Sequence, residues 1–352
     1  MREKAFVAGV GMAPFCKPGA SDPYDVMAAT AVRKALDNAG LGYEAVEQAI
    51  AGYVYGDSTS GQRALYEVGM TGIPIVNVNN NCSTGSTALF LARQLVESGA
   101  VDCVLALGFE QMQPGALSGQ WSDRPSPFSR FDELCDEIAP YDAPIALRYF
   151  GGAGKEYMER YGVKPDLFAR VRAKASRHAA HNPMALLRQV VSEEEVMAAP
   201  MVFPEAGMTR LMACPPTCGA AAAILVSRRF AERMNLDRRV FIAAQAMTTD
   251  RPGTFDKRSM MALVGDDMTR EAAAQVYEQA GIGPGDVDVV ELHDCFAHNE
   301  VLIYEGLGLC PDGGAEKFVA AGDNTYGGRI VTNPSGGLLS KGHPLGATGL
   351  AQ

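Results

Sequence analysis

An internal repeat limits the folds open to this chain. Residues 36–42 resemble residues 277–283, and in both places a valine and an acidic residue follow shortly afterwards. Each copy predicts a helix, a glycine that ends it, a short linker and a strand. A strand candidate precedes each helix, at residues 5–11 and 240–246. The repeat predicts two similar α/β halves with the active site where they meet, although chance similarity in a Gly/Ala-rich chain is the alternative.

Strands and helices alternate through the first half, which predicts a largely parallel sheet covered on both faces. The predicted strands are residues 50–56, 73–78, 103–108 and 220–226, and the predicted helices are residues 22–39 and 88–99. Residues 113–213 change character and read as an insertion between the last two strands. The predicted domains are an N-terminal half (1–112 with 214–235), an inserted loop domain (113–213) and a C-terminal half (236–352).

Composition excludes several classes of protein. The chain has 352 residues, of which 47% are hydrophobic and 20% are charged, and its formal net charge is −10. This acidity argues against a general nucleic-acid binder. The sequence shows neither a signal peptide nor an apolar run that could span a bilayer. Eight cysteines show no disulfide framework, and the pair Cys214 and Cys218 lacks the partners of a zinc site, so we expect no metal and a reducing, intracellular compartment.

Cys82 is the first candidate nucleophile. It lies where the predicted strand 73–78 gives way to the predicted helix 88–99, within a polar stretch rich in Asn, Ser, Thr and Gly (79–87). A helix N-terminus favours negative charge and lowers a cysteine pKa. The alternative is a buried free cysteine that caps a core helix. The position between strand and helix favours the nucleophile.

Two further motifs carry reactive side chains in the second half. A predicted buried strand at 287–292 leads into His293 and Cys295, and open α/β folds place chemistry at such strand ends. Later, His343 lies in a Gly/Pro-rich turn before a helix of small residues. A single histidine in such a turn is commonly a polar loop residue. Together, the two histidines and two cysteines provide a nucleophile, a base, a second thiol and oxyanion donors.

Basic residues gather within the inserted region. Against the acidic background they form a local positive field suited to phosphates, although a solvated helix face is an equal alternative. The phosphate candidates are Lys155, Arg170, Arg172, Lys174 and Arg177.

The motifs at residues 79–88, 293–296 and 342–349 resemble those of the thiolase superfamily, and specifically its sterol carrier protein 2/X type. Residues 52–59, 108–110 and 322–328 support this, so the resemblance covers essentially the whole chain. It implies a five-layer αβαβα thiolase fold in which the loop domain receives coenzyme A. It also implies homodimers or homotetramers, and a location that is cytoplasmic in a bacterium or peroxisomal in a eukaryote.

The activity implied by the resemblance is thiolysis of a 3-ketoacyl-CoA, with coenzyme A as a substrate and no metal or redox cofactor. His343 would activate Cys82, which would attack the 3-keto carbon and leave an acyl-cysteine and an acetyl-CoA enolate. Cys295 would protonate that enolate and then deprotonate the incoming CoA. His293, with His343, would stabilise the enolate oxygen, and the backbone N–H of Cys82 would belong to the second oxyanion hole.

Two departures from the family pattern stand out. The chain ends at Gln352, where thiolases continue through a last strand and a Gly-rich loop, so we expect a truncated C-terminal half. Cys218 stands where thiolases usually carry aspartate. Two alternatives stay open: a thiolase-fold retro-aldol lyase on steroid side-chain CoA esters, against which Cys82 counts, and a non-catalytic lipid or acyl-CoA binding protein.

Overall fold

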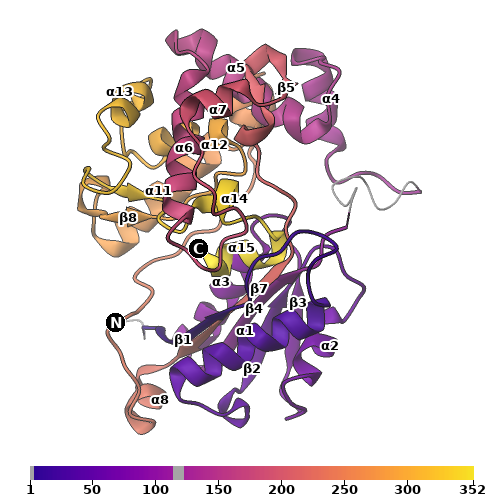
Figure 1. Ribbon diagram of the computed structural model, residues 1–352. Helices are drawn as coiled ribbons and strands as arrows, with labels where there is room; N and C mark the ends of the chain where they lie inside the picture. Colours follow the sequence, from indigo (N-terminus) through magenta and orange to yellow (C-terminus); the bar gives the residue numbers. More distant parts are fainter. Residues whose placement is uncertain (1–3, 114–122) are drawn as a thin grey trace. The chain divides into compact units, whose positions relative to one another are not determined.

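The computed structural model describes residues 4–113 and 123–352, so part of the predicted loop domain (114–122) lies outside the described residues. The chain forms two compact units (Figure 1). Unit 1 comprises Met1–Ala116, Pro216–Gln245 and Gly342–Gln352, and unit 2 comprises Leu117–Pro215 and Ala246–Lys341. The predicted loop domain thus shares unit 2 with most of the predicted C-terminal half. The predicted domain boundaries were drawn from the repeat and the insertion, whereas the two units are defined by compactness. The domain boundaries therefore stay a prediction.

A five-stranded sheet organises unit 1. Its strands run in the order β1 (Phe6–Met12), β7 (Gly219–Val226), β4 (Cys103–Glu110), β2 (Gln48–Gly52) and β3 (Ile75–Val78). β2 pairs in parallel with β3 and β4, whereas β7 is antiparallel to β1 and β4. Only β7 therefore runs against the other four strands, and the predicted largely parallel sheet is in fact mixed. β7 reaches its place beside β4 after the long insertion, as the sequence predicted.

Helices cover both faces of this sheet, as predicted. On one face, α1 (Tyr24–Ala39) and α2 (Ser60–Tyr66) pack against side chains such as Leu105 and Leu107 of β4. On the other, α3 (Thr84–Glu97) packs against Val104 and Ala106, and Leu350 of α15 (Leu345–Ala351) joins that cluster. Successive strand residues point to opposite faces, so one strand serves both clusters. A short helix, α8 (Arg228–Arg233), follows β7.

Glycines let α15 pack directly against its neighbours. A Cβ atom at Gly108 of β4 would lie 2.2 Å from the Gly346 carbonyl oxygen, and one at Gly349 would lie 2.1 Å from Ser86 Oγ. Both distances are too short for a real Cβ atom. The backbone of Gly108 therefore contacts the backbone of Gly346 directly, and the backbone of Gly349 contacts Ser86 directly. This contact fixes where α15, and the turn before it, lie on the sheet.

Unit 2 is mainly helical, and its apolar core includes Tyr157, Phe168 and Tyr304 from three different helices. Two short sheets, β5–β6 and β8–β9, complete it. The helices are α4 (Ser129–Ile138), α5 (Ile145–Tyr161), α6 (Asp166–Ala179), α7 (Glu193–Ala198), α9 (Pro252–Asp256), α10 (Met260–Leu263), α11 (Asp266–Ala280), α12 (Ala297–Gly306), α13 (Ala315–Ala320) and α14 (Gly337–Ser340). The strands are β5 (Met201–Phe203), β6 (Met208–Thr209), β8 (Val289–Val290) and β9 (Val331–Thr332).

The two repeat copies share their local structure. α1 ends at Gly40 (φ 67°, ψ 32°) and α11 ends at Gly281 (φ 70°, ψ 32°), both in the left-handed conformation that suits glycine. A short 3₁₀ turn and a strand follow each glycine. The predicted helix, glycine stop and strand are therefore confirmed in both copies.

Two strand predictions in the second half are wrong in extent. Residues 240–246 form no strand, and only Phe241 bridges to Phe6 beside the edge of the sheet. The predicted buried strand 287–292 shortens to β8, whose Val289 is 55% exposed. Within the described residues β8 pairs with β9 alone, so the other edge of β8 has no neighbouring strand in that sheet.

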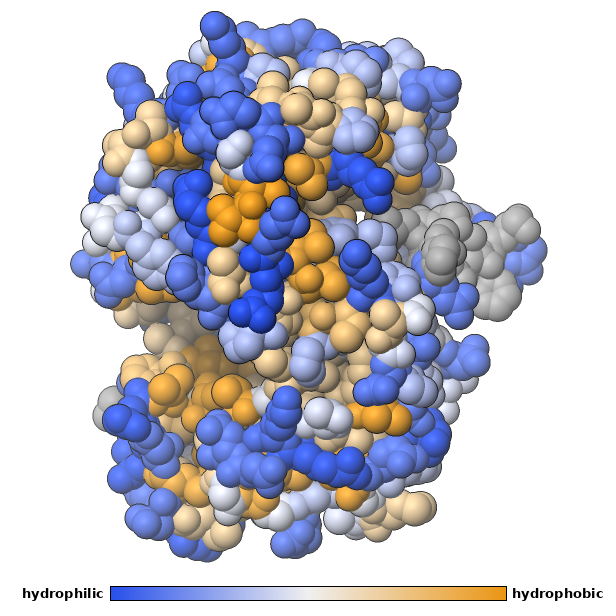
Figure 2. Space-filling model, viewed as in Figure 1, coloured by the Kyte–Doolittle hydropathy of each residue, from blue (hydrophilic) through white to orange (hydrophobic). Residues whose placement is uncertain are grey.

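Among the residues that the structure describes, none of the helices combines the length and apolar character needed to cross a membrane. On the face shown in Figure 2, hydrophilic and hydrophobic residues are interspersed over each unit.

Replacing Gly108 by alanine should destabilise unit 1, because the new methyl group would collide with the Gly346 carbonyl oxygen. We expect a loss of about 1–3 kcal/mol in the free energy of unfolding, as for other overpacked sites. Urea unfolding followed by circular dichroism measures it. Gly285→Ala is the control, since no atom lies within 4 Å of its added Cβ. Equal midpoints for the two variants would contradict the backbone contact.

His298 on α12 should make stability depend on pH. Its ring lies against that of Phe168, with centroids 3.9 Å apart and the planes tilted by 32°, and burial lowers the pKa of His298 to about 3. The unfolded chain protonates this histidine below its usual pKa near 6.5 and the folded chain does not, so stability is lost as pH falls. From pH 7 to pH 5 this one group costs about 2 kcal/mol.

The measurement is the shift of the urea midpoint between pH 7 and pH 5. His298→Phe keeps an aromatic ring against Phe168 and removes the titration, so its shift should be smaller by this amount. An unchanged shift in the variant would show that His298 is not responsible.

Candidate active site

The first part of the candidate site is the Cys82 turn, defined as residues 79–84 in unit 1. It joins β3 to α3, and Asn81 at its centre has a left-handed φ of 49°. Thr84 braces the turn from the start of α3, because its hydroxyl donates to the Asn81 carbonyl (2.6 Å) and accepts from the Asn80 N–H (2.8 Å). The predicted position of Cys82 between strand and helix is confirmed.

His343 follows Gly342, whose φ of 113° suits glycine alone. The His343 N–H donates to Thr217 Oγ1 (3.1 Å), and the ring atom Nδ1 lies 2.7 Å from Thr348 Oγ1. The Thr348 hydroxyl donates its hydrogen to the Pro344 carbonyl (2.9 Å), so it accepts from Nδ1. In the neutral ring this assigns the hydrogen to Nδ1 and leaves Nε2 as the basic nitrogen.

Unit 1 brings Cys82 and His343 together: the Cys82 sulfur and a ring nitrogen of His343 lie within 4.8 Å of each other. The expected lowering of the Cys82 pKa is wrong. Burial of the sulfur raises the pKa of the Cys82 thiol to about 12, and the nearby carboxyl of Glu110 adds to the increase. The residue as a whole is only half-buried, but protein atoms surround the sulfur itself. α3 begins at Thr84, two residues beyond Cys82, so the helix terminus does not outweigh this burial.

Glu110 belongs to a motif that supports the family resemblance, but the sequence did not predict a role for it. It ends β4, is 1% exposed, and accepts hydrogen bonds from the N–H groups of Val54 (3.1 Å), Tyr55 (2.9 Å) and Gly346 (3.0 Å). Burial raises the pKa of Glu110 to about 7, against the three donors. Glu110 therefore ties β4 to the start of α15 next to His343. Its place at the end of a buried strand, where open α/β folds carry functional residues, could have identified Glu110 from the sequence.

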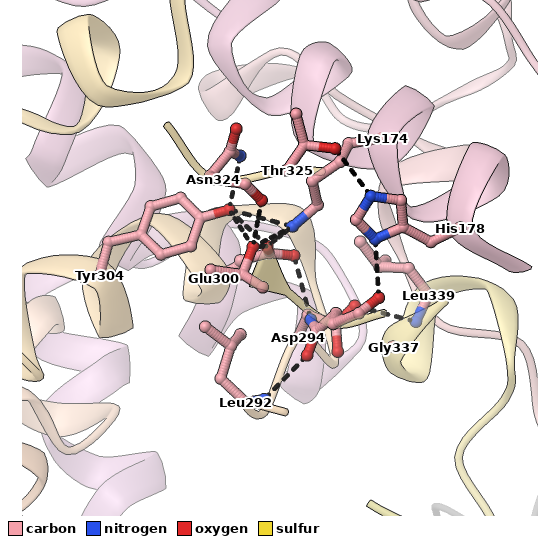
Figure 3. Close-up of polar contacts among 12 residues, drawn as sticks. Lys174, His178, Leu292, Asp294, Glu300, Tyr304, Asn324, Thr325, Gly337 and Leu339 are labelled. Atoms are coloured by element: carbon pink, nitrogen blue, oxygen red, sulfur yellow. Dashed lines mark hydrogen bonds and ion pairs between the residues drawn. The ribbon is translucent and has the colours of Figure 1, made fainter. Parts of the chain in front are cut away.

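The second part is the His293 turn, defined as residues 292–296 in unit 2. The His293 carbonyl accepts from Asn299 Nδ2 (2.7 Å), and the Cys295 carbonyl accepts from the Cys214 N–H (2.9 Å). Between them, the buried Asp294 carboxylate accepts from the N–H groups of Leu338 (2.7 Å) and Leu339 (3.3 Å) in α14. Figure 3 shows Asp294 beside Leu339. Unit 2 thus places His293 and Cys295 in one firmly held turn.

Burial lowers the pKa of His293 to about 4, so this ring is neutral near pH 7. Cys295 is 5% exposed. Burial also raises the pKa of Asp294, with Glu300 adding to the increase and Lys174 and the α14 N–H groups opposing it. The turn therefore presents a neutral imidazole and a buried thiol.

The five phosphate candidates in unit 2 differ in their surroundings. Arg172 and Lys174 are buried, with Arg172 donating to Ser340 Oγ (2.8 Å) and Lys174 paired with Glu300. Their internal partners make a phosphate role for these two weaker than the sequence suggested. Lys155 forms a surface ion pair with Glu159 (2.5 Å).

Arg170 bonds to Asp166 (3.0 Å) and Glu193 (3.4 Å), while Arg177 is exposed. These two arginines line a cavity of about 380 Å³ together with the buried Lys174, the acidic Glu193 and Thr325. The acidic partners of Arg170 favour the solvated helix face, whereas the cavity that Arg170 and Arg177 line favours the basic field, so both interpretations stay open.

Family models match both ends of the chain. A model described as the thiolase N-terminal domain matches residues 6–191, and one described as thiolase C-terminal domain-like matches residues 254–352. Human sterol carrier protein 2 is 53% identical over 99% of this chain and 64% of its own length, so the chain spans less than two thirds of that relative. Non-specific lipid-transfer protein-like 2 of Caenorhabditis elegans is 44% identical over 100% of this chain and 87% of its own. Benzoylsuccinyl-CoA thiolase subunit BbsB of Thauera aromatica is 32% identical over 100% and 88%.

Solved structures agree on the fold. The Ltp2-ChsH2(DUF35) aldolase matches with a TM-score of 0.80 at 23% identity, over 99% of this chain and 88% of that one. Human mitochondrial 3-ketoacyl-CoA thiolase in complex with CoA matches with a TM-score of 0.72 at 17% identity, over 99% and 89%. The expected thiolase fold is confirmed. With the family models and the relatives, these matches show that the chain belongs to the thiolase family and is similar to the sterol carrier protein 2 type.

Proposed function

We propose that this protein cleaves 3-ketoacyl-CoA by thiolysis, transferring the shortened acyl group to CoA through an acyl-Cys82 intermediate. The observation that carries the proposal is the arrangement in unit 1, where Cys82 lies near a histidine whose basic nitrogen is set by Thr348. A cysteine and a base oriented by a third group form the usual arrangement of an activated nucleophile.

The first step needs the base because the thiol has a high pKa. Nε2 of His343 takes the Cys82 proton, and the thiolate attacks the 3-keto carbon. The C2–C3 bond then breaks, which leaves an acyl thioester on Cys82 and the enolate of acetyl-CoA, or of propionyl-CoA from a 2-methyl substrate. Separating a thiolate from its proton in a buried site is costly unless the imidazolium stays close to it, as the distance within unit 1 allows.

The residues of unit 2 act on the leaving enolate. Cys295 protonates C2 of the enolate and afterwards takes the proton of the incoming CoA thiol, so that the CoA sulfur attacks the acyl-Cys82 and restores the free cysteine. His293, neutral because burial lowers its pKa to about 4, donates an N–H to the enolate oxygen together with His343. This scheme requires both turns to act on one substrate.

Coenzyme A enters this proposal as a substrate, without a metal or redox cofactor. Among the phosphate candidates we favour Arg170 and Arg177, which line the cavity in unit 2, with Lys155 next. A homodimer or homotetramer, and a location that is peroxisomal in a eukaryote or cytoplasmic in a bacterium, remain predictions.

The test is intact mass after brief mixing of the full-length protein with a 3-ketoacyl-CoA, with and without CoA. We expect an acyl adduct that CoA removes and that Cys82→Ala abolishes. Cys16→Ala is the matched control, because Cys16 is also a half-buried free cysteine of unit 1. An adduct that survives Cys82→Ala, or the absence of any adduct, would contradict the proposal.

The same samples separate the two alternatives. Aldol cleavage of a steroid side-chain CoA ester that persists in Cys82→Ala would identify a lyase, the activity named for the aldolase that shares the fold. Tight acyl-CoA binding without adduct or cleavage would identify a binding protein.

A further inference from the structure

Asn333 occupies the centre of the polar network behind the His293 turn. It directly follows β9, is completely buried, and has a left-handed φ of 51°. Its N–H donates to the Val290 carbonyl (2.7 Å), and its own carbonyl accepts from His178 Nδ1 (2.9 Å). The backbone of Asn333 is therefore tied both to β8 and to α6.

The side chain of Asn333 reaches the residue next to His293. Its Oδ1 accepts from the Leu292 N–H (2.8 Å), and its Nδ2 donates to Glu300 Oε2 (3.4 Å). With the bond to Val290, Asn333 holds the chain on both sides of Glu291, immediately before His293. A shift of this one amide would carry the start of the His293 turn with it.

Glu300 fixes the direction of that amide. Its other oxygen accepts from Lys174 and from Tyr304, and Lys174 also donates to Thr332 Oγ1 (2.6 Å). Figure 3 shows Lys174 and Tyr304 converging on Glu300. A buried carboxylate held by a lysine accepts hydrogen bonds only, so it orients the Asn333 amide with Nδ2 toward Glu300 and Oδ1 toward Leu292.

We propose that Asn333 is a positioning residue for His293, acting through the Leu292 N–H while Lys174 and Glu300 hold its amide in place. This inference rests on the proposed function, in which His293 donates to the enolate oxygen. Asn299 fixes the His293 carbonyl and the Asp294 side chain bonds to α14, so these contacts hold the turn at and after His293, while Asn333 holds the segment before it. A donor displaced by about 1 Å loses as much as 100-fold in rate.

The test replaces Asn333 by glycine, which keeps the left-handed backbone and removes only the amide. We expect kcat for thiolysis to fall by roughly 10- to 100-fold with KM for the 3-ketoacyl-CoA within about twofold of wild type. We also expect the ring signals of His293 to move in spectra of the histidine-labelled full chain, where comparison with His293→Ala assigns them.

Asn182→Ala is the matched control. Asn182 Nδ2 donates to the Ser335 carbonyl (3.0 Å), and its Oδ1 accepts from the Met184 N–H (2.9 Å), so this variant loses as many side-chain hydrogen bonds close to Asn333. Because Asn182 does not bond to the His293 turn in these contacts, kcat and the His293 signals should stay near wild type. Asn333→Ser, whose shorter side chain loses the bonds to Leu292 and Glu300 but keeps a polar group in the buried site, should act in the same direction as glycine and decides the question if Asn333→Gly does not fold.

A folded Asn333→Gly with unchanged kcat and unchanged His293 signals would overturn the positioning role, as would equal effects of Asn182→Ala. If the wild type shows no thiolysis, the proposed function fails, and the His293 signals alone still decide whether Asn333 positions that ring.

Discussion

The contact on which unit 1 depends is the packing of α15 directly onto β4 and α3. Gly108 and Gly346 allow a strand and a helix to meet through their backbones, and Gly349 does the same beside Ser86. This contact carries the chain from Gly342 into α15 at a fixed height above the sheet, where His343 lies near Cys82. Glu110 strengthens the same junction by accepting the Gly346 N–H. The position of His343 therefore depends on glycines that allow close backbone packing as much as on the hydrogen bonds of His343 itself.

In unit 2 the segment before the His293 turn packs on a buried ion pair, Lys174 with Glu300. Lys174 and Glu300 have both left water, and the desolvation of such a pair offsets much of their attraction. Their value lies in direction: hydroxyl and amide groups of Tyr304, Thr332 and Asn333 complete the coordination of the two charges. A fully bonded network of this kind admits few arrangements, so it can hold the segment before His293 more strictly than apolar packing would.

The sequence predicted the features that depend on a few neighbouring residues and missed those that depend on contacts with distant residues. Gly40 and Gly281 end their helices as predicted, because a left-handed glycine is a property of a few neighbouring residues. The strand and helix that flank Cys82 follow for the same reason. Residues 240–246 had the apolar character of a strand, but a strand also needs a partner along its length, and within the described chain the segment forms a single bridge, at Phe241, through the backbone bonds of Val240 and Ile242.

The errors about charge have the same origin. Arg172 and Lys174 belong to a run of basic residues that the sequence allows to be a solvated helix face, and only the packing of α6 in unit 2 shows that both are buried. The Cys82 pKa was expected to fall from its place near a helix terminus, whereas it rises because protein atoms surround the sulfur. Both properties are set by residues distant in sequence, and neither leaves a local pattern.

A high thiol pKa need not oppose nucleophilic chemistry in this setting. At neutral pH Cys82 is a thiol and His293 is neutral, so the resting turns avoid an isolated buried charge. In the proposed reaction, transfer of the proton to His343 would create a thiolate and an imidazolium side by side, and their opposite charges would offset much of the cost of ionisation. After the proposed attack the imidazolium would remain as a charge-assisted donor when negative charge reaches the enolate oxygen, and such hydrogen bonds are about twice as strong as neutral ones. The high pKa of the Cys82 thiol would therefore keep the buried site uncharged until a substrate is bound.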